Sequence, residues 1–207
     1  YLRGIEETLQ DGEWYEGDVV VHNHPYHGSS HSPDLAIAIP VFWKGELVGF
    51  SANTAHHIDI GAATPGLIID IRDVYAEGML FSGIKLYRKG QRNDAIWQFM
   101  ESNSRTAKML IDDIEAQIAS ARLGEQRMKE LISEYGIDTF KSACNELLNY
   151  TERMMRQQIK AIPDGTYRAE GWCDDDGRNR DIKLPIKVAV KVKGDNVTVD
   201  LTGSADQ

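Results

Sequence analysis

Residues 22–61 read HNHPYHGSSHSPDLAIAIPVFWKGELVGFSANTAHHIDIG, and they hold all 6 histidines of the 207-residue chain. Within this stretch, two strand-like runs at 35–43 and 47–54 flank the pair Lys44-Gly45, which predicts a β-hairpin. Pro40 lacks the N–H that a central strand donates, so it predicts an edge strand or a bulge. A bulge at this point would shift the pairing of the two strands by one residue.

The predicted hairpin brings the two ends of the stretch together. A loop of two or three residues places Asp34 opposite Ala55 or His56, and His31 then falls opposite residue 58 or 59. Directly opposed residues have Cβ atoms roughly 5 Å apart. The open end of the hairpin therefore gathers, without help from the rest of the fold, His31, Asp34, His56, His57 and Asp59.

This collection of imidazole and carboxylate groups suits a metal ion. Imidazole supplies neutral nitrogen ligands, and a carboxylate compensates the charge of Mn²⁺, Fe²⁺ or Zn²⁺. A two-histidine, one-carboxylate face with open positions for substrate would be formed by His31, Asp34 and His56. An alternative stays open: some of these histidines are turn residues or hydrogen-bonded core groups. We expect His22, His24 and His27 to contact the substrate or the metal ligands rather than to bind the metal themselves.

The rest of the chain predicts an α+β fold in three parts. Residues 1–92 form a β-rich region that carries the His/Asp metal site. Residues 93–162 form a helical segment, and residues 163–207 form an antiparallel β region. The last region stops directly after a strand-like run with no closing element. We therefore expect a fragment of a longer subunit.

Two features inside these parts are specific enough to test. The apolar run at 79–87 predicts a further strand before the helical segment. Apolar stripes at helical spacing predict two long amphipathic helices at 106–135 and 138–162. Because their connector has only two residues, the two helices are expected to pack as an antiparallel pair.

Composition narrows the classes of partner. Asp and Glu total 32 against 23 Lys and Arg, so the net charge of −9 disfavours nucleic acid and polybasic membrane contacts. No apolar run reaches the ~18 residues that a membrane-spanning helix needs. Cys144 and Cys173 form no CxxC motif, which favours a reducing, cytoplasmic location. No Walker loop or dinucleotide fingerprint is present, so a nucleotide would bind elsewhere.

Ten different short segments, spread along the whole chain, carry a family resemblance. They are residues 17–34, 40–42, 49–50, 55–61, 64–66, 73–78, 103–105, 162–167, 174–177 and 199–203. As a set they resemble the hydantoinase B family. This family includes acetone carboxylase alpha subunits, acetophenone carboxylase subunits, the B subunit of N-methylhydantoinase and the C-terminal half of 5-oxoprolinase. The runs Asn23-His24-Pro25-Tyr26 and Ser30-His31-Ser32-Pro33-Asp34 look more like acetone carboxylase alpha. The doublet His56-His57 is common on the hydantoinase side.

The resemblance implies a metal-containing subunit of an ATP-dependent ketone carboxylase of the acetone or acetophenone type. Such a complex joins a ketone to CO₂ from bicarbonate, and a hydantoinase A-type partner binds the ATP, with a small third subunit in some cases. The implied metal is Mn²⁺, with Zn²⁺ and Fe²⁺ as alternatives. Two other functions stay open: ATP-dependent hydrolysis of a cyclic amide, as in hydantoinase B and 5-oxoprolinase, and a metal-stabilised scaffold without catalysis.

The resemblance also assigns roles to individual residues. The metal ligands that it implies are His31, Asp34 and His56, with Asp59 as an adjacent candidate. The acid–base or substrate contacts that it implies are His24, His27 and His57.

Overall fold

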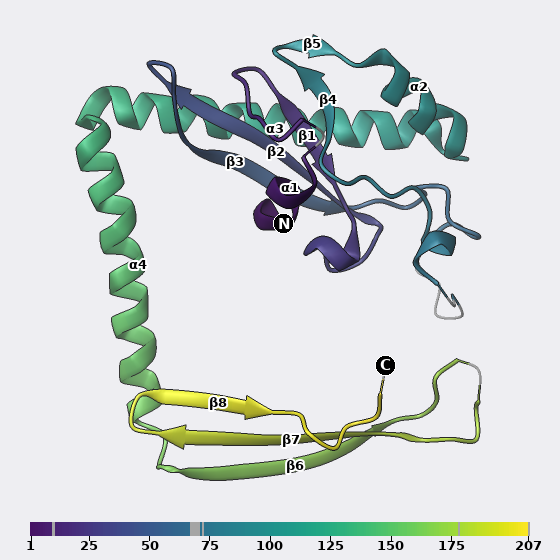
Figure 1. Cartoon of the computed structure of the whole chain (residues 1–207), viewed down its shortest axis with the longest axis vertical. Helices are drawn as coiled ribbons and strands as arrows, with labels where there is room; N and C mark the ends of the chain where they lie inside the picture. The colour runs from purple at the N-terminus through teal and green to yellow at the C-terminus, as the bar shows by residue number, and fades with distance from the viewer. Residues whose placement is uncertain (10, 67–70, 72, 178, 207) are drawn as a thin grey trace. The chain divides into compact units, whose positions relative to one another are not determined.

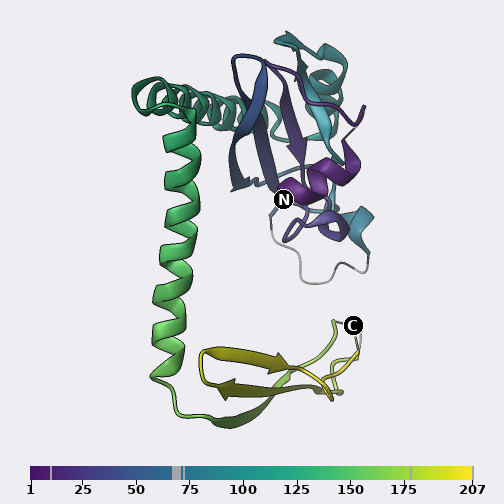
Figure 2. The ribbon, with the colours of Figure 1, turned by 60° about the vertical axis from the view of Figure 1, so that its left-hand side comes forward.

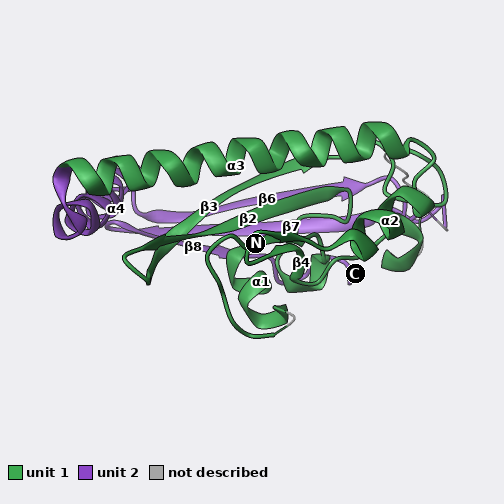
Figure 3. Cartoon of the chain, turned by 90° about the horizontal axis from the view of Figure 1, so that it is seen from above, with its two compact units in different colours: residues 1–134 green, residues 135–207 purple. Residues whose placement is uncertain are grey.

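The computed structural model describes residues 1–207 except 10, 67–70, 72, 178 and 207. It contains both helices and antiparallel sheets, so the predicted α+β class is confirmed. The chain divides into two compact units, residues 1–134 and 135–207, which Figure 3 colours separately. The boundaries predicted near residues 92 and 162 mark changes of element type, and they stay predictions. Among the described residues, no helix combines the length and apolar character needed to cross a membrane.

The first unit is built on a five-stranded antiparallel sheet (Figure 1). The strand order is β3-β2-β1-β4-β5. Its elements are β1 Val19–His22, β2 Asp34–Trp43, β3 Glu46–His56, β4 Ile84–Arg88 and β5 Gln91–Arg92, with short 3-10 helices η1 Pro25–His27 and η2 Val74–Glu77 in the connections. The central strand β1 is buried along its whole length, because its β-branched residues meet packed layers on both faces of the sheet.

The hairpin predicted around Lys44-Gly45 is confirmed as β2 and β3. The two turn residues have φ angles of 51° and 85°, and positive values at both positions are what a type I′ turn requires. The register shifts by one residue between Val41 and Phe42, close to Pro40. The predicted one-residue shift is therefore present. Its extra residue, Val48, lies in the edge strand β3, whereas Pro40 lies in β2, an interior strand and not the edge strand that was the other possibility.

The strand predicted at 79–87 is shorter than expected and begins at Ile84. The residues before it bond to groups outside the sheet ladder. Met79 donates its backbone N–H to the carbonyl of Ile60, and Phe81 donates its own to the Asn23 side chain. Gly83 then turns the chain with a φ of 63°. These hydrogen-bond partners depend on the tertiary structure, and an apolar run in the sequence does not reveal them.

Helices cover both faces of the sheet. On one side lie α2 Asp94–Asn103 and α3 Ala107–Tyr135, and α3 follows the length of the sheet (Figure 3). On the other side α1 Leu2–Thr8 packs beside Val20 and Ala38 through Ile5. Figure 2 shows this helix, in purple near the N-terminus, beside the strands. The α3 stripe is confirmed over the part that meets the sheet, where the buried apolar residues are Leu110, Ile114, Ile118 and Ala121.

The second unit combines α4 Ile137–Lys160 with a three-stranded antiparallel sheet. Its strands are β6 Gly165–Cys173, β7 Leu184–Lys193 and β8 Asn196–Asp200, in the order β6-β7-β8. Both long helices exist near their predicted bounds. No residue of α4 is buried, and most of its apolar stripe, including Cys144, is exposed. Because α3 and α4 belong to different units, their antiparallel pairing stays a prediction.

A close backbone approach joins α1 to η1, which follows His24 and ends at His27. A Cβ atom added at Gly4 would lie 1.4 Å from the carbonyl oxygen of His27. Neither backbone can yield to such a contact without moving the helix away from the segment. The absence of a side chain at Gly4 therefore sets how closely α1 covers the histidine-rich loop.

We expect Gly4→Ala to destabilise the protein. Alanine favours a helix by at most about 1 kcal/mol over glycine, whereas overpacking costs about 1–3 kcal/mol, so the clash decides the sign. Urea denaturation would show a lower midpoint than the unchanged chain. Gly171→Ala is the control, because nothing lies within 4 Å of its added Cβ. Equal midpoints for the two variants would contradict the close approach.

Candidate metal centre

Three side chains converge at the open end of the β2–β3 hairpin. His31 Nε2 lies 2.9 Å from Asp34 Oδ1, and His56 Nδ1 lies 3.1 Å from the same oxygen. The two ring nitrogens are 3.2 Å apart, and the rings stack with their centroids 4.9 Å apart. Over the residues that the structure describes, these three form the group whose ligand atoms could hold a metal ion.

The hairpin register places Asp34 and His56 together. Continued from the turn without the bulge, the pairing would put Ala55 opposite Asp34. The one-residue shift instead makes His56 its direct partner, one of the two positions predicted from the sequence. His31 joins them through a tight turn, in which the Asp34 backbone N–H donates to the His31 carbonyl over 3.2 Å.

The Asp34 carboxylate is held in its ionised form. Burial raises its pKa, but hydrogen bonds from Ser30, His56 and His31 outweigh burial, and the pKa lies below its usual value. The Ser30 hydroxyl donates to Oδ2 over 2.6 Å, which orients the carboxylate and leaves Oδ1 facing the two imidazoles. The carboxylate can therefore supply negative charge at the centre of the group at neutral pH.

The spacing of the three atoms fits a divalent cation. With metal–ligand bonds of about 2.1 Å, ligand atoms at right angles around an ion lie roughly 3 Å apart. The observed separations of 2.9, 3.1 and 3.2 Å match this spacing on all three sides of the triangle. Two neutral imidazoles and one carboxylate leave the remaining positions around an ion open to substrate. The donor set suits Mn²⁺, Fe²⁺ or Zn²⁺ alike.

Asp59, predicted as an adjacent ligand, is not brought to this group. Its Oδ1 accepts hydrogen bonds from the Gly61 N–H (2.9 Å) and from Arg105 Nη1 (3.1 Å), and its Oδ2 accepts one from the Arg105 N–H (2.6 Å). Burial raises the pKa of Asp59, but these N–H donors and the guanidinium charge outweigh burial, so the pKa lies below its usual value. Asp59 thus ties the segment after β3 to the start of α3.

His57, predicted as catalytic, lies in the interior and is only 3% exposed. Its Nε2 is 2.8 Å from Oε1 of Gln117 on α3, and its backbone N–H donates to the Pro33 carbonyl over 3.0 Å. Burial lowers the pKa of His57, although the bond to Gln117 raises it, so the neutral ring is favoured. This placement gives His57 an interior partner and holds it away from solvent.

His24 and His27 form a second cluster at η1. Their rings meet edge to face with centroids 4.8 Å apart, and both side chains are partly exposed. Burial lowers the pKa of His24, and the neighbouring His27 lowers it further. The predicted role of these two rings in proton transfer or substrate contact is compatible with their exposure, and it stays a prediction.

Several residues that organise the site were missed in the sequence. Asn23 pins the histidine-rich loop, since its amide donates to the Ser32 and Met79 carbonyls over 2.6 and 2.8 Å. Gln117 reaches the strand ends from α3, and Ser30 orients Asp34. One signal was available: Gln117 is a polar residue on the otherwise apolar buried stripe of α3. Nothing in the sequence distinguishes Ser30 from its neighbours.

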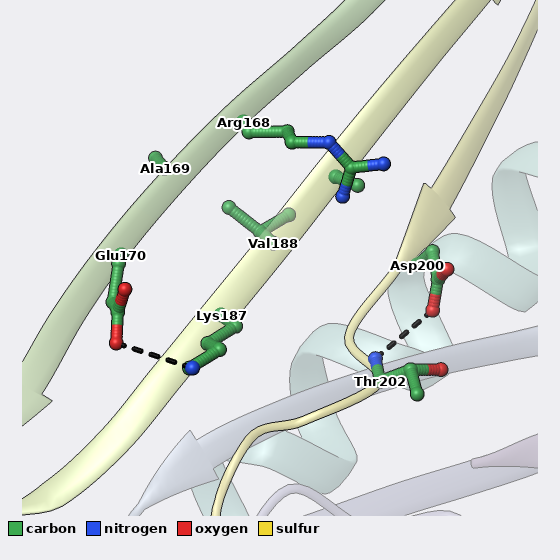
Figure 4. Close-up of a pocket in the computed structure, with 8 residues that line it drawn as sticks. Arg168, Ala169, Glu170, Lys187, Val188, Asp200 and Thr202 are labelled. Atoms are coloured by element: carbon green, nitrogen blue, oxygen red, sulfur yellow. Dashed lines mark hydrogen bonds and ion pairs between the residues drawn. The ribbon is translucent and has the colours of Figure 1, made fainter.

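The second unit contains a surface hollow of about 290 Å³ on the polar face of its sheet (Figure 4). Two of its charges are paired within the sheet, because Glu170 and Lys187 face each other across the β6–β7 ladder at 3.4 Å. Asp200 accepts a hydrogen bond from the Thr202 N–H over 2.9 Å. The hollow gathers no ligand set comparable to that of the hairpin, so the hairpin remains the candidate site.

Comparison with known proteins points to one family. The model of the Hydantoinase B/oxoprolinase family matches residues 2–207. The chain is 50% identical to a putative D-/L-hydantoinase B subunit of Pseudomonas sp. strain NS671, over 100% of this chain and 36% of that protein. It is 34% identical to the beta subunit of caprolactamase from Pseudomonas jessenii, over 89% of this chain and 32% of that protein. The chain therefore spans about a third of the length of these relatives.

Solved structures share the fold. The crystal structure of ATP-dependent caprolactamase from Pseudomonas jessenii matches with a TM-score of 0.84 and 32% identity, over 91% of this chain and 33% of that one. A nucleotide-free acetone carboxylase structure also matches with a TM-score of 0.84. Its identity is 22%, over 92% of this chain and 27% of that one, so this match shows the fold alone.

Buried His22 should make the stability of the site region depend on pH. Burial lowers its pKa to about 4 from 6.5, against the raising effect of its bond to the His27 carbonyl. The unfolded state therefore binds a proton more tightly, and stability falls as the pH drops from about 6.5 to about 4. This one group should remove about 3 kcal/mol across that range.

The measurement is urea denaturation at several pH values for the unchanged chain and for His22→Gln. The glutamine amide can still donate to the His27 carbonyl but does not titrate. We expect the free energy of unfolding of the variant to fall less steeply below pH 6.5. Parallel pH profiles for the two proteins would rule out this role for His22.

Proposed function

Because the chain belongs to the Hydantoinase B/oxoprolinase family, we propose that it supplies the metal-binding site of an ATP-dependent enzyme that opens a cyclic amide. The observation that carries the proposal is the convergence of His31, Asp34 and His56 within hydrogen-bonding distance. The hydantoinase and caprolactamase relatives support the reaction class, and the geometry of the three side chains supports the proposed position of a metal ion. The proposed activity belongs to the whole enzyme, of which this chain is one part.

Hydrolysis is favoured over the ketone carboxylation first predicted from the sequence. The 50% identical relative is a putative hydantoinase subunit, and the matching structure at 32% identity is a caprolactamase. Hydantoins and lactams are both cyclic amides. The acetone carboxylase match shares the fold at much lower identity. The comparisons thus favour the function that the sequence analysis held as its alternative.

The proposed chemistry divides between the metal group and the loop. Ring opening adds water to the amide carbonyl carbon, breaks the C–N bond and leaves a proton on the nitrogen. A divalent cation held by His31, Asp34 and His56 would supply a Lewis acid for the carbonyl oxygen. His24 and His27 are the partly exposed imidazoles that could accept a proton from water and return one to the nitrogen.

ATP would be handled by a partner. The sequence carries no phosphate-binding loop, and the names of the relatives describe subunits of larger enzymes. We therefore propose a hydantoinase A-type partner that binds ATP, with a small third subunit only in the carboxylase alternative. The acidic net charge of −9 also leaves a nucleotide better placed on another subunit.

Ketone carboxylation is the second candidate function. It is favoured by His24 in the run Asn23-His24-Pro25-Tyr26, where many hydantoinase-type members carry aspartate, and by the run Ser30-His31-Ser32-Pro33-Asp34. In this alternative the same metal group, expected to hold Mn²⁺, would stabilise an enolate oxygen while bicarbonate supplies the CO₂. The scaffold function, in which the ion only stabilises the fold, is the third.

We expect the intact subunit, purified with its partners, to retain close to one Mn²⁺, Zn²⁺ or Fe²⁺ ion per chain by elemental analysis. The double variant His31→Ala/Asp34→Ala should lose that ion, because two of its three ligands are gone. The control is Asp112→Ala, which removes an exposed carboxylate on α3. A metal-free wild-type subunit, or a double variant that keeps the ion, would refute the metal site.

The reaction class is decided by assays of the same complex. ATP-dependent ring opening of hydantoins or lactams, without incorporation of labelled bicarbonate, is the expected result. Ketone-dependent fixation of the label would instead establish a carboxylase. Circular dichroism beside turnover tests the scaffold alternative: ligand variants that stay folded but lose turnover exclude it, whereas loss of activity only through unfolding would support it.

A further inference from the structure

Gln117 is a polar residue on the buried, apolar face of α3, and it is 8% exposed. Its side-chain Nε2 donates to the Leu35 carbonyl and to Asn53 Oδ1, each over 3.0 Å. Its Oε1 lies 2.8 Å from His57 Nε2, and its backbone carbonyl accepts a hydrogen bond from Asn53 Nδ2 over 2.8 Å. One helix residue therefore bonds to both strands of the hairpin.

These partners border the three convergent side chains. Leu35 directly follows Asp34 on β2, and His57 directly follows His56 at the end of β3. The backbone of His57 reaches across to the Pro33 carbonyl, inside the turn that joins His31 to Asp34. Gln117 thus holds the main chain next to two of the proposed ligands and, through His57, contacts the segment that carries the third.

We infer that Gln117 is a positioning residue that sets the separation of His31, Asp34 and His56, with His57 as its relay. The inference rests on the proposed metal site. It also gives His57 a role different from the catalytic one predicted in the sequence, because an interior imidazole bonded to Gln117 fixes the strand end beside His56.

The orientation of the amide follows from its neighbours. Leu35 and Asn53 present acceptor oxygens, so the NH₂ end of Gln117 faces them and its oxygen faces His57. His57 must then donate from Nε2. An apolar residue at 117 could make none of these bonds, so it would remove the donor to the Leu35 carbonyl and the acceptor for the His57 N–H in the interior.

The convergent side chains need such support because they are partly exposed. The side chains of His31, Asp34 and His56 have 32%, 22% and 43% of their surface accessible. Ligands must be held within roughly 0.5 Å of the productive arrangement, and residues that orient ligands typically change metal affinity about 10- to 100-fold when they are replaced. Contacts to a rigid helix at both strand ends supply that restraint.

The test compares Gln117→Met, which keeps the length of the side chain without its hydrogen bonds, with Ile118→Val as a packing control on the same helix. The dissociation constant for Mn²⁺ is measured by equilibrium dialysis on the purified full-length complex after removal of bound metal. We expect Gln117→Met to weaken Mn²⁺ binding about 10- to 100-fold and Ile118→Val to leave it unchanged. Asn53→Ala, which removes one partner of Gln117, is the milder second variant and should weaken binding less.

Unchanged Mn²⁺ affinity in both Gln117→Met and Asn53→Ala, with the wild type binding Mn²⁺, would overturn the inference and leave the proposed metal site intact. If the wild type binds Zn²⁺ or Fe²⁺ in place of Mn²⁺, the same comparison is made with that ion. If it binds none of the three, the proposed metal site fails, and hydrogen exchange of peptides covering 31–36 and 52–58 decides the positioning role. Faster exchange in Gln117→Met than in Ile118→Val would support positioning, and equal exchange would overturn it.

Discussion

The register of the β2–β3 hairpin is the constraint on which the candidate site depends. Side chains alternate between the faces of a strand, so a slip of one residue would exchange the environments of His56 and His57. The bulge beside Pro40 converts the register set by the Lys44-Gly45 turn into the one that pairs Asp34 with His56. Local turn chemistry and one extra residue therefore determine which groups meet at the far end of the hairpin.

Polar groups in the interior hold the exposed side chains in place. Asn23 closes the histidine-rich loop onto the segment before β4, and Asp59 binds Arg105 at the start of α3. Gln117 connects α3 to the hairpin. Asn23, Asp59 and Gln117 each have the hydrogen-bond partners that make their burial tolerable. The apolar core gives these anchors a fixed frame, since α2 and α3 pack against the strands that bear the site.

The sequence was sufficient for features encoded by neighbouring residues. The pair Lys44-Gly45 between two strand-like runs, and the apolar stripes of the helices, are local patterns, and they predicted the hairpin, its register within one residue and the long helices. The same local pattern brought His31, Asp34 and His56 together. The roles of Asp59 and His57 depend on Arg105 and Gln117, which lie 46 and 60 residues away along the chain. Only the tertiary structure reveals such partners, and the same holds for the late start of β4.

The histidine-rich loop and the hairpin have separate anchors. Asn23 and the tight contact at Gly4 hold the η1 segment, whereas strand pairing and α3 hold Asp34 and His56. Replacements at Tyr26 or its neighbours can therefore accumulate through descent while the strand register is inherited unchanged. Changes in the exposed part of this loop would leave the pairing of β2 with β3 in place, so a shared architecture can persist among relatives whose reactions differ.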